Sequence, residues 1–388
     1  MKKFVAVATG ALLAVSACAF AACGESKDVT EYKYKAVDLT KAEAKAAFVD
    51  DLVKNIDFEN LIGDTSSKDF KLGLAAEAGM KIDINASAQG TMLPGAASAV
   101  VLQAALSYET SSSAKLNYSA DGIAAETEAR IAGSLKASDE LYALLEEYAE
   151  LDEATVAAIK KATSKFDYKT KAYLDSEYVY MQIPTELLET LPEEIRNELP
   201  ASEGGKYKLP IGGSADTGYG LMSATSFASA PADDATKETF RSYATIVVEY
   251  LSMCKVKIEV SKEDGFAVKL SADSEAIFNV AKELIPDSSE TLEMLGEYVT
   301  FNSLNTVIYF AVDKDGAFKQ LSVNLDADAN VSVNLADLID EGLPTVTGSA
   351  KISLNLSLKK FSGKITVPAN DSSYVDLSVL SGTVEEIE

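Results

Sequence analysis

The chain has 388 residues, of which 60 are acidic and 35 basic, so its formal net charge is −25. It contains three cysteines, no tryptophan and no histidine. The lack of histidine excludes Ser-His-Asp and Cys-His catalysis and histidine-ligated metals. The excess of carboxylates argues against binding to nucleic acid by charge attraction. Hydrophobic residues at 47% and charged residues at 24% are typical of a globular protein that buries a core.

Residues 1–22 have the plan of a secretory signal peptide. Lys2 and Lys3 precede an apolar stretch over residues 4–15, which is shorter than the roughly 20 residues that a membrane-spanning helix needs. Small residues then lead to a cysteine in a pattern that resembles the bacterial lipobox. We expect cleavage before Cys23, because a polar sequence follows it, whereas Cys18 is followed by more apolar chain and is the alternative.

The expected cleavage defines the mature chain. Removal of residues 1–22 takes away Lys2 and Lys3 and changes the formal charge from −25 to −27. A diacylglyceryl group on Cys23 would anchor the protein to the outer face of a bacterial cytoplasmic membrane, since two acyl chains give stable binding where one is marginal. Residues 23–39 are polar and are expected to be a tether. Cys254 alone then remains in the folded region, so no internal disulfide is expected.

A first unit is predicted over residues 40–200. Thr40 and Glu43 have the spacing of a capping box, and apolar residues at helical spacing predict a helix over 40–62. Alternating apolar residues predict a strand over 70–84, with Gly79 as a candidate bend, and further strands over 100–108, 114–120 and 123–137. A helix over 139–162, a hairpin over 171–184 and short helices over 185–191 and 193–199 follow.

Glycines and serines dominate residues 201–234, which predicts a long loop between two units. The second unit, 235–388, begins with a helix over 235–254 whose buried face is expected to carry Phe240, Tyr243, Val247 and Leu251. A hairpin over 255–272 and helices over 274–285 and 288–298 come next. Strands are predicted over 304–313, 317–333, 348–358 and 361–367. The similar order of elements suggests either one large unit or two duplicated ones.

Two aspartate-rich stretches partly match the ligand spacing of a calcium-binding loop. Asp313-Lys314-Asp315-Gly316 has part of the spacing, but Ala311 occupies the place of the first oxygen ligand. Asp326, Asp328 and Asn330 alternate correctly, but Val331 replaces the loop glycine. Both stretches are therefore interpreted as a hairpin turn and a solvated strand face. We predict no metal site, no cofactor and no catalytic residue.

Apolar strand faces and helix stripes must bury against each other. The simplest interpretation is a filled core, in which helices plug a curved sheet. The alternative is an apolar groove that accepts a hydrophobic ligand. Candidate ligand-binding residues are those of the cleanest alternating stretches: Leu72, Leu74, Met80, Ile82, Ile84, Leu321, Val323 and Leu325.

The helix at 40–62 leading into the strand at 70–84, the KAYLDSEYVYMQIP hairpin and the closing LSLKKFSGKITVPA segment resemble the LolA/LppX-like lipoprotein half-barrels. The resemblance implies an α+β fold in which a curved antiparallel sheet wraps helices and holds acyl chains or other apolar ligands. The expected function is that of a non-enzymatic membrane-anchored lipoprotein that binds or shields an apolar ligand. The alternative is a structural or interaction lipoprotein with a filled core and an acidic outer face.

Overall fold

The computed structural model describes residues 28–57, 61, 71–90, 100–119, 122–148, 156–157, 160, 165–189, 196–197, 199–210, 234–284, 296–334, 345–370 and 372–377. The predicted signal peptide 1–22, Cys18, Cys23 and most of the predicted loop 201–234 lie outside these residues. So do large parts of the helices predicted over 139–162, 193–199 and 288–298.

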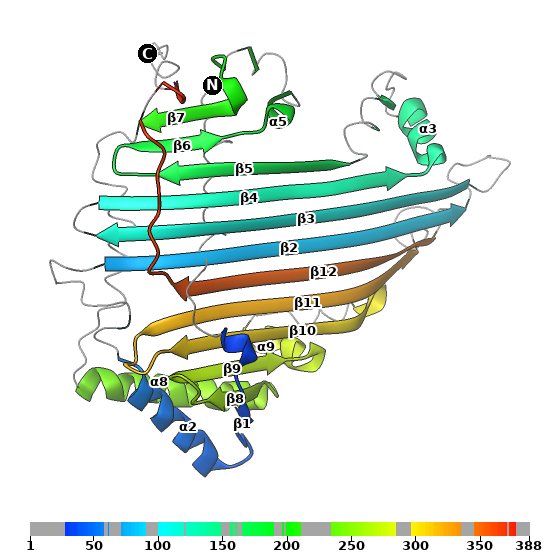
Figure 1. The fold of residues 1–388 in the computed structure, drawn as a ribbon. Helices are drawn as coiled ribbons and strands as arrows, with labels where there is room; N and C mark the ends of the chain where they lie inside the picture. The colour runs from blue at the N-terminus through cyan, green and yellow to red at the C-terminus, as the bar shows by residue number, and fades with distance from the viewer. Residues whose placement is uncertain are drawn as a thin grey trace, which may run out of the picture.

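The described strands form one open, curved sheet in the order β1-β8-β9-β10-β11-β12-β2-β3-β4-β5-β6-β7-β13 (Figure 1). Neighbouring strands are antiparallel except β13, which is parallel to β7. The predicted antiparallel sheet is confirmed. Both predicted units contribute to it and meet where β2 pairs with β12. The strands are β1 (Lys35–Ala36), β2 (Lys71–Gly90), β3 (Val100–Ser119), β4 (Gly122–Ala137), β5 (Phe166–Leu174), β6 (Tyr178–Gln182), β7 (Lys206–Pro210), β8 (Lys257–Ser261), β9 (Phe266–Ala272), β10 (Val299–Val312), β11 (Phe318–Asn334), β12 (Thr345–Lys360) and β13 (Val375–Asp376).

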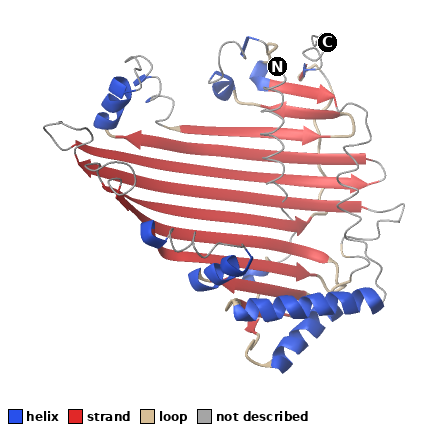
Figure 2. Cartoon of the chain, turned by 180° about the vertical axis from the view of Figure 1, so that it is seen from behind, coloured by secondary structure: helices blue, strands red, loops and turns tan. Residues whose placement is uncertain are grey.

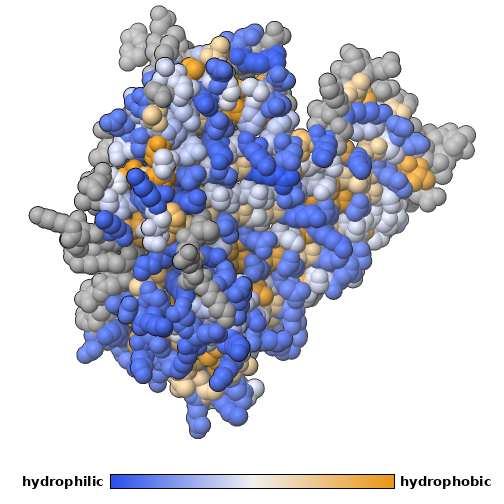
Figure 3. Space-filling model, viewed as in Figure 1, coloured by the Kyte–Doolittle hydropathy of each residue, from blue (hydrophilic) through white to orange (hydrophobic). Residues whose placement is uncertain are grey.

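The alternation of side chains gives the sheet two different faces. Successive residues of a strand point to opposite sides, so Met80 and Ile82 share one side while Lys81 and Asp83 share the other. The first side, which also carries Leu325 and Leu354, is called the apolar face. The second, which also carries Asp326 and Lys351, is called the charged face. Figure 3 shows the charged face, where hydrophilic side chains predominate.

Helices cover one end of the apolar face. The helices α2 (Ala42–Asn55) and α8 (Asp234–Met253) pack on β8, β9 and β10 and enclose the main core, as Figure 2 shows from behind. Burial of each large apolar side chain there contributes about 1.5–3 kcal/mol. The core residues of this cluster are Phe48, Val49, Val53, Ile56, Ala244, Val248, Ile258, Phe266, Val268 and Val312. The helix α9 (Ser274–Leu284) also contacts β9 and β10, whereas α3 (Asp139–Tyr148) contacts β3 and α5 (Thr185–Glu189) follows β6.

Both ends of the described chain cross the charged face. Residues 28–36, called the N-terminal strap, include the 3-10 helix η1 (Val29–Glu31) and end in β1, which pairs with the edge strand β8. Val29 is fully buried against Ala267 and Ala311. Residues 361–376, called the C-terminal strap, end in β13, which pairs with β7. The two short strands therefore cover the edges of the sheet, which would otherwise offer unpaired backbone groups to other chains.

Several local predictions need correction. The helix α2 begins at Ala42, and its cap residue Lys41 makes no side-chain capping bond. The Thr40 backbone N–H and hydroxyl instead donate to Asp38, so the capping box does not form. The predicted strands 100–108 and 114–120 are one strand, β3, and β2 runs through Gly79 without a break. Residues 206–210, predicted as loop, form β7 after the 3-10 helix η2 (Glu203–Gly205).

The segment 361–367 is also corrected, because it is extended but is not a strand of the sheet. Its alternating apolar side chains pack on the sheet, and its backbone is not paired with a neighbouring strand. Phe361 and Ile365 bury against Ala75 on the charged face. A single bond from the Phe361 N–H to the Gly73 carbonyl starts the crossing. Among the helices of the described residues, none is long and apolar enough to span a bilayer.

Candidate functional site

The apolar face consists of rows that run across the central strands. Leu325, Leu354 and Met80 form one row, because Leu325 pairs with Leu354 and Leu354 pairs with Met80. Ala327, Ile352 and Ile82 form the next row in the same way. These rows join strands from both predicted units, so the apolar surface is continuous across the β12–β2 pairing.

The predicted ligand-binding residues share this face but differ in accessibility. Leu72 is only 7% exposed, which places it in the core rather than on an accessible surface. The others keep part of their surface open. Half-buried members are Leu74, Met80, Ile82, Val323 and Leu325, and exposed members are Ile84 and Leu321.

The open part of the apolar face extends beyond the predicted residues. Five aliphatic side chains from β2, β3, β4, β11 and β12 each expose 36–37% of their surface: Ile84, Leu106, Ile131, Leu321 and Ile352. All five point to the same side. Leu321 pairs with Leu358, and Ile352 pairs with Ile82. The register of β2 and β3 sets Ile84 opposite Leu106, and Ile131 pairs with Thr110, which is on the same side of β3 as Leu106. Exposed aliphatic side chains that share one face of a sheet make that face a candidate binding site.

A second apolar surface flanks the first. On α8, Tyr243, Ile246, Val247 and Met253 expose 52–70% of their surface, and they lie at helical spacing. We call these four residues the α8 stripe. Sequence patterning assigned Tyr243 and Val247 to the buried face, but the structure buries Ala244 and Val248 instead.

The rotation of α8 is fixed from two sides. On one side Arg241 pairs with Asp50 of α2 at 3.2 Å, and Lys45 of α2 pairs with Glu249 at 2.5 Å. On the other side the Tyr250 hydroxyl donates to the Val280 carbonyl of α9 at 3.2 Å. Because Tyr250 shares a side of the helix with Tyr243 and Val247, this side of α8 is turned toward α9, while Ala244 and Val248 pack on the sheet.

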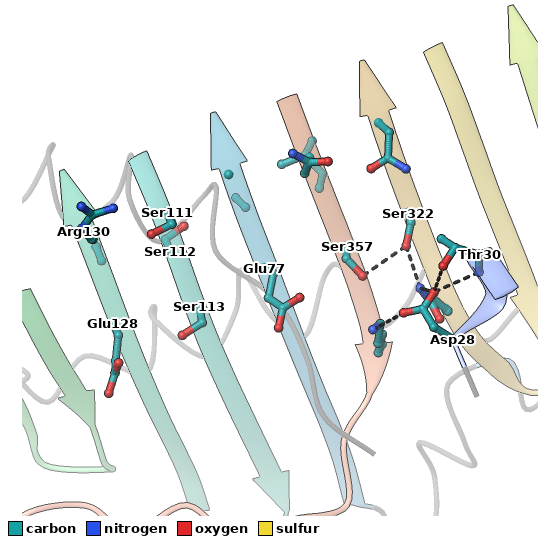
Figure 4. Close-up of a pocket in the computed structure, with 18 of the residues that line it drawn as sticks. Asp28, Thr30, Glu77, Ser111, Ser112, Ser113, Glu128, Arg130, Ser322 and Ser357 are labelled. Carbon is teal, nitrogen blue, oxygen red and sulfur yellow. Dashed lines mark hydrogen bonds and ion pairs between the residues drawn. The ribbon is translucent and has the colours of Figure 1, made fainter. Parts of the chain in front are cut away.

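The charged face carries a different kind of concavity. A hollow of about 660 Å³ lies over the middle of the sheet, beside the N-terminal strap (Figure 4). Its polar lining comes from the strap and six strands and includes Asp28, Glu77, Ser111, Ser113, Glu128, Arg130, Lys171, Ser322, Asn355, Ser357 and Lys359. A second hollow of about 600 Å³ on the same face is lined by Asn85, Gln103, Lys136 and Thr347, among others. Most of the side chains that line the two hollows are polar or charged.

Ion pairs and hydrogen bonds occupy most charged groups around the larger hollow. Arg130 pairs with Asp167 at 2.8 Å and with Glu109 at 3.0 Å. Lys359 pairs with Asp28 at 2.6 Å. Partial burial opposes ionisation of Asp28, but hydrogen bonds from Lys359 and Thr30 outweigh it and lower the pKa of that carboxyl to about 2.

The aspartates considered as calcium ligands have protein partners. Asp313 accepts from the backbone N–H groups of Asp315 and Ala317 and closes the β10–β11 turn. Asp326 accepts from Ser353, and Asp328 accepts from Asn302 and pairs with Lys351 at 3.1 Å. Over the described parts of the chain, no three acidic or cysteine side chains gather as a metal site.

No protein-family model and no curated protein sequence matches this chain. Among solved structures, it is similar to the secretin InvG of the Salmonella SPI-1 type III secretion injectisome, with 10% identity over 93% of this chain and 86% of that chain, at a TM-score of 0.15. The β-barrel of the InvG secretin domain gives 11% identity over 97% and 84% of the two chains and a TM-score of 0.12. Similarity at this level supports no conclusion about fold or function.

Proposed function

We propose that this protein is a non-enzymatic lipoprotein of the bacterial cell envelope that binds an apolar, lipid-like ligand on the open apolar face of its sheet. One observation carries the proposal: aliphatic side chains from five strands remain exposed on one face of the sheet, in a chain of strongly negative charge. Keeping such a surface in contact with water is unfavourable by about 25 cal/mol for each Å². A lipid that covered it would recover that free energy.

The half-barrel interpretation is part of this proposal. A sheet with α2 and α8 on its apolar side at one end has the main elements that the LolA/LppX resemblance implies. In this interpretation the β8–β10 end holds the filled core, and the remaining strands provide the ligand surface. The accessible residues to the side of α8 support this division.

The anchor would hold the folded domain close to the membrane. Asp28 is fixed on β12 through Lys359, and only four residues separate it from the expected acylation site at Cys23. Five residue steps span at most about 17 Å when fully extended. The domain would therefore stay within a short distance of the bilayer, with the tether attached on the charged face.

The alternative function is an interaction lipoprotein that uses its charged face. The 660 Å³ hollow favours this alternative, because it offers hydroxyl, amide and ionised groups to a polar partner. In that case the apolar face would bind no lipid.

Binding of a fluorescent apolar probe, N-phenyl-1-naphthylamine, to detergent-free protein separates the two functions. We expect saturable binding that Leu106→Asp abolishes. The matched control is Val101→Asp, since Val101 lies on the same strand, points to the charged face and is similarly exposed at 42%. Absence of binding, together with absence of co-purifying lipid in native mass spectrometry, would refute the proposed function. Equal loss in both variants would refute the assignment to this face.

A further inference from the structure

We infer that the apolar face selects uncharged amphipaths, with their hydrocarbon chain on the aliphatic strands and an uncharged hydrogen-bonding group on a patch of free hydroxyls. This inference rests on the proposed function and names the ligand class for the same site. Three features of the face carry it: its division into two chemically different halves, its unpaired hydroxyls and its lack of charge.

The aliphatic half lies on β11, β12 and β2. Its rows are built from leucine, isoleucine, valine and methionine, such as Val323 beside Leu356 and Leu354 beside Met80. These side chains present only hydrocarbon, so they would contact an acyl or alkyl chain.

The other half lies on β3, β4 and β5, where hydroxyl side chains are interspersed with aliphatic ones such as Leu106 and Ile131. β2 and β3 keep one register from Lys71–Ser119 to Gly90–Val100, which puts Met80 opposite Thr110 and Ala78 opposite Ser112. Ser112 pairs with Ala129, and Ala129 pairs with Thr170. Thr127 stands between Ala114 and Ala172. Thr110, Ser112, Thr127 and Thr170 are called the hydroxyl patch.

The hydroxyls of this patch are free. The Thr127 hydroxyl is buried and has no hydrogen-bond partner. In the part of the chain that the structure describes, Thr110, Ser112 and Thr170 have no side-chain hydrogen bond either. Thr110, Ser112 and Thr170 are half-buried, so a ligand hydroxyl, ester or ether oxygen could bond to their hydroxyls.

Charge is almost excluded from the same side. Among the described residues, the apolar-face positions of six strands hold one charged side chain, Lys360 at the end of β12. The six strands are β2, β3, β4, β5, β11 and β12. Lys360 pairs with Asp313 at 3.6 Å. The charged side chains of these strands otherwise point to the charged face. An ionised head group seated among the patch would lose water without gaining a counter-charge, which is strongly unfavourable. An uncharged polar group carries no such penalty.

Displacement of N-phenyl-1-naphthylamine by compounds that share one chain length tests the selectivity. We expect monododecanoylglycerol to displace the probe at a concentration at least about tenfold lower than dodecanoate or dodecylammonium. Ser112→Ala with Thr170→Val should weaken monododecanoylglycerol about fivefold more than it changes the affinity of the probe. The control Ser113→Ala removes a hydroxyl from the adjacent, charged-face position of β3 and should change neither.

Two further outcomes make the test decisive. Thr110→Lys should reverse the order and favour dodecanoate, because it supplies the missing counter-charge. Equal displacement by neutral and ionised compounds, or an unchanged double variant, would overturn this inference while leaving apolar binding intact. Failure of the probe to bind the unmodified protein would instead refute the proposed function.

Discussion

The Tyr250 hydroxyl of α8 donates to the Val280 carbonyl of α9 at 3.2 Å. This bond ties the exposed side of α8 to a helix that itself rests on β9 and β10. It therefore holds the α8 stripe beside the open sheet, although none of the four stripe residues belongs to the main core.

The α8 stripe should contribute to ligand binding but not to stability. Val247→Asp places a carboxylate on the α8 stripe and should weaken binding of N-phenyl-1-naphthylamine by about tenfold if the ligand covers the stripe, since the charge must then be desolvated. The midpoint of urea unfolding should change little, because Val247 is 52% exposed. Ser242→Asp, at an exposed position of α8 outside the stripe, is the control. Equal weakening by both variants would remove α8 from the site.

The Asp28–Lys359 pair should make stability depend on acid pH. The pKa of Asp28 is lowered from 3.8 to about 2 in the folded protein, so the unfolded chain binds the proton more tightly. The stabilisation is therefore fully present above about pH 4 and is lost as the pH falls toward 2. After allowance for solvent screening we expect about 1 kcal/mol.

Urea unfolding of the native protein and of Asp28→Asn between pH 2 and pH 6 measures this effect. The difference in unfolding free energy should be largest near pH 6, should be mostly lost by pH 2 and should vanish only below that pH. Asp315→Asn, at an exposed position of the β10–β11 turn, should behave like the native protein throughout. A difference that stayed constant with pH would show that Asp28 acts through packing alone.

The tight turn at Gly316 should be intolerant of a side chain. Gly316 has a φ of +83°, and an added Cβ would lie 2.7 Å from the backbone N of Asp57, which donates to the Gly316 carbonyl. Gly316→Ala should therefore destabilise the protein by about 2 kcal/mol or more, because strain and a backbone clash combine. Gly296→Ala, with open space around the added atom, should be neutral or slightly stabilising. Thermal unfolding of both variants measures the contrast, and equal shifts would contradict it.

Acylation should depend on one cysteine. Cys23→Ala should move the protein from the membrane fraction to the soluble fraction and abolish incorporation of radiolabelled palmitate, because the diacylglyceryl anchor is lost. Cys18→Ala should leave both unchanged. If Cys18→Ala abolished labelling and Cys23→Ala did not, the anchor would be at Cys18.

Period-two patterning predicted the sheet well where each face has one chemistry. The β2, β11 and β12 alternation located Ile82 and Ile352, which pair directly although they come from opposite ends of the chain. The middle of β3 was missed because Thr110 and Ser112 occupy apolar-face positions and interrupt the pattern. The segment 361–367 was wrongly predicted as a strand. Its alternation is real, but it reflects packing of Phe361 and Ile365 on the face of the sheet and not pairing within it.

The site could be predicted only in part. Sequence patterning found one aliphatic half of the apolar face, but the hydroxyl patch depends on pairing between β3, β4 and β5, which no local pattern specifies. The helix α8 carries apolar residues on two sides, so periodicity could not decide that Val248 packs inward and Val247 faces outward. Leu72 fits the pattern of its neighbours, yet its burial depends on tertiary packing.

Photolabelling tests the central claim most directly. The full mature protein would be irradiated with a monoacylglycerol whose chain carries a diazirine, and the labelled residues would be mapped by peptide mass spectrometry. Our account predicts labels at apolar-face positions, above all Ile84, Leu106, Ile131, Leu321 and Ile352, and on the α8 stripe. Labels confined to the charged face, or labelling that an excess of unlabelled monoacylglycerol fails to suppress, would contradict it.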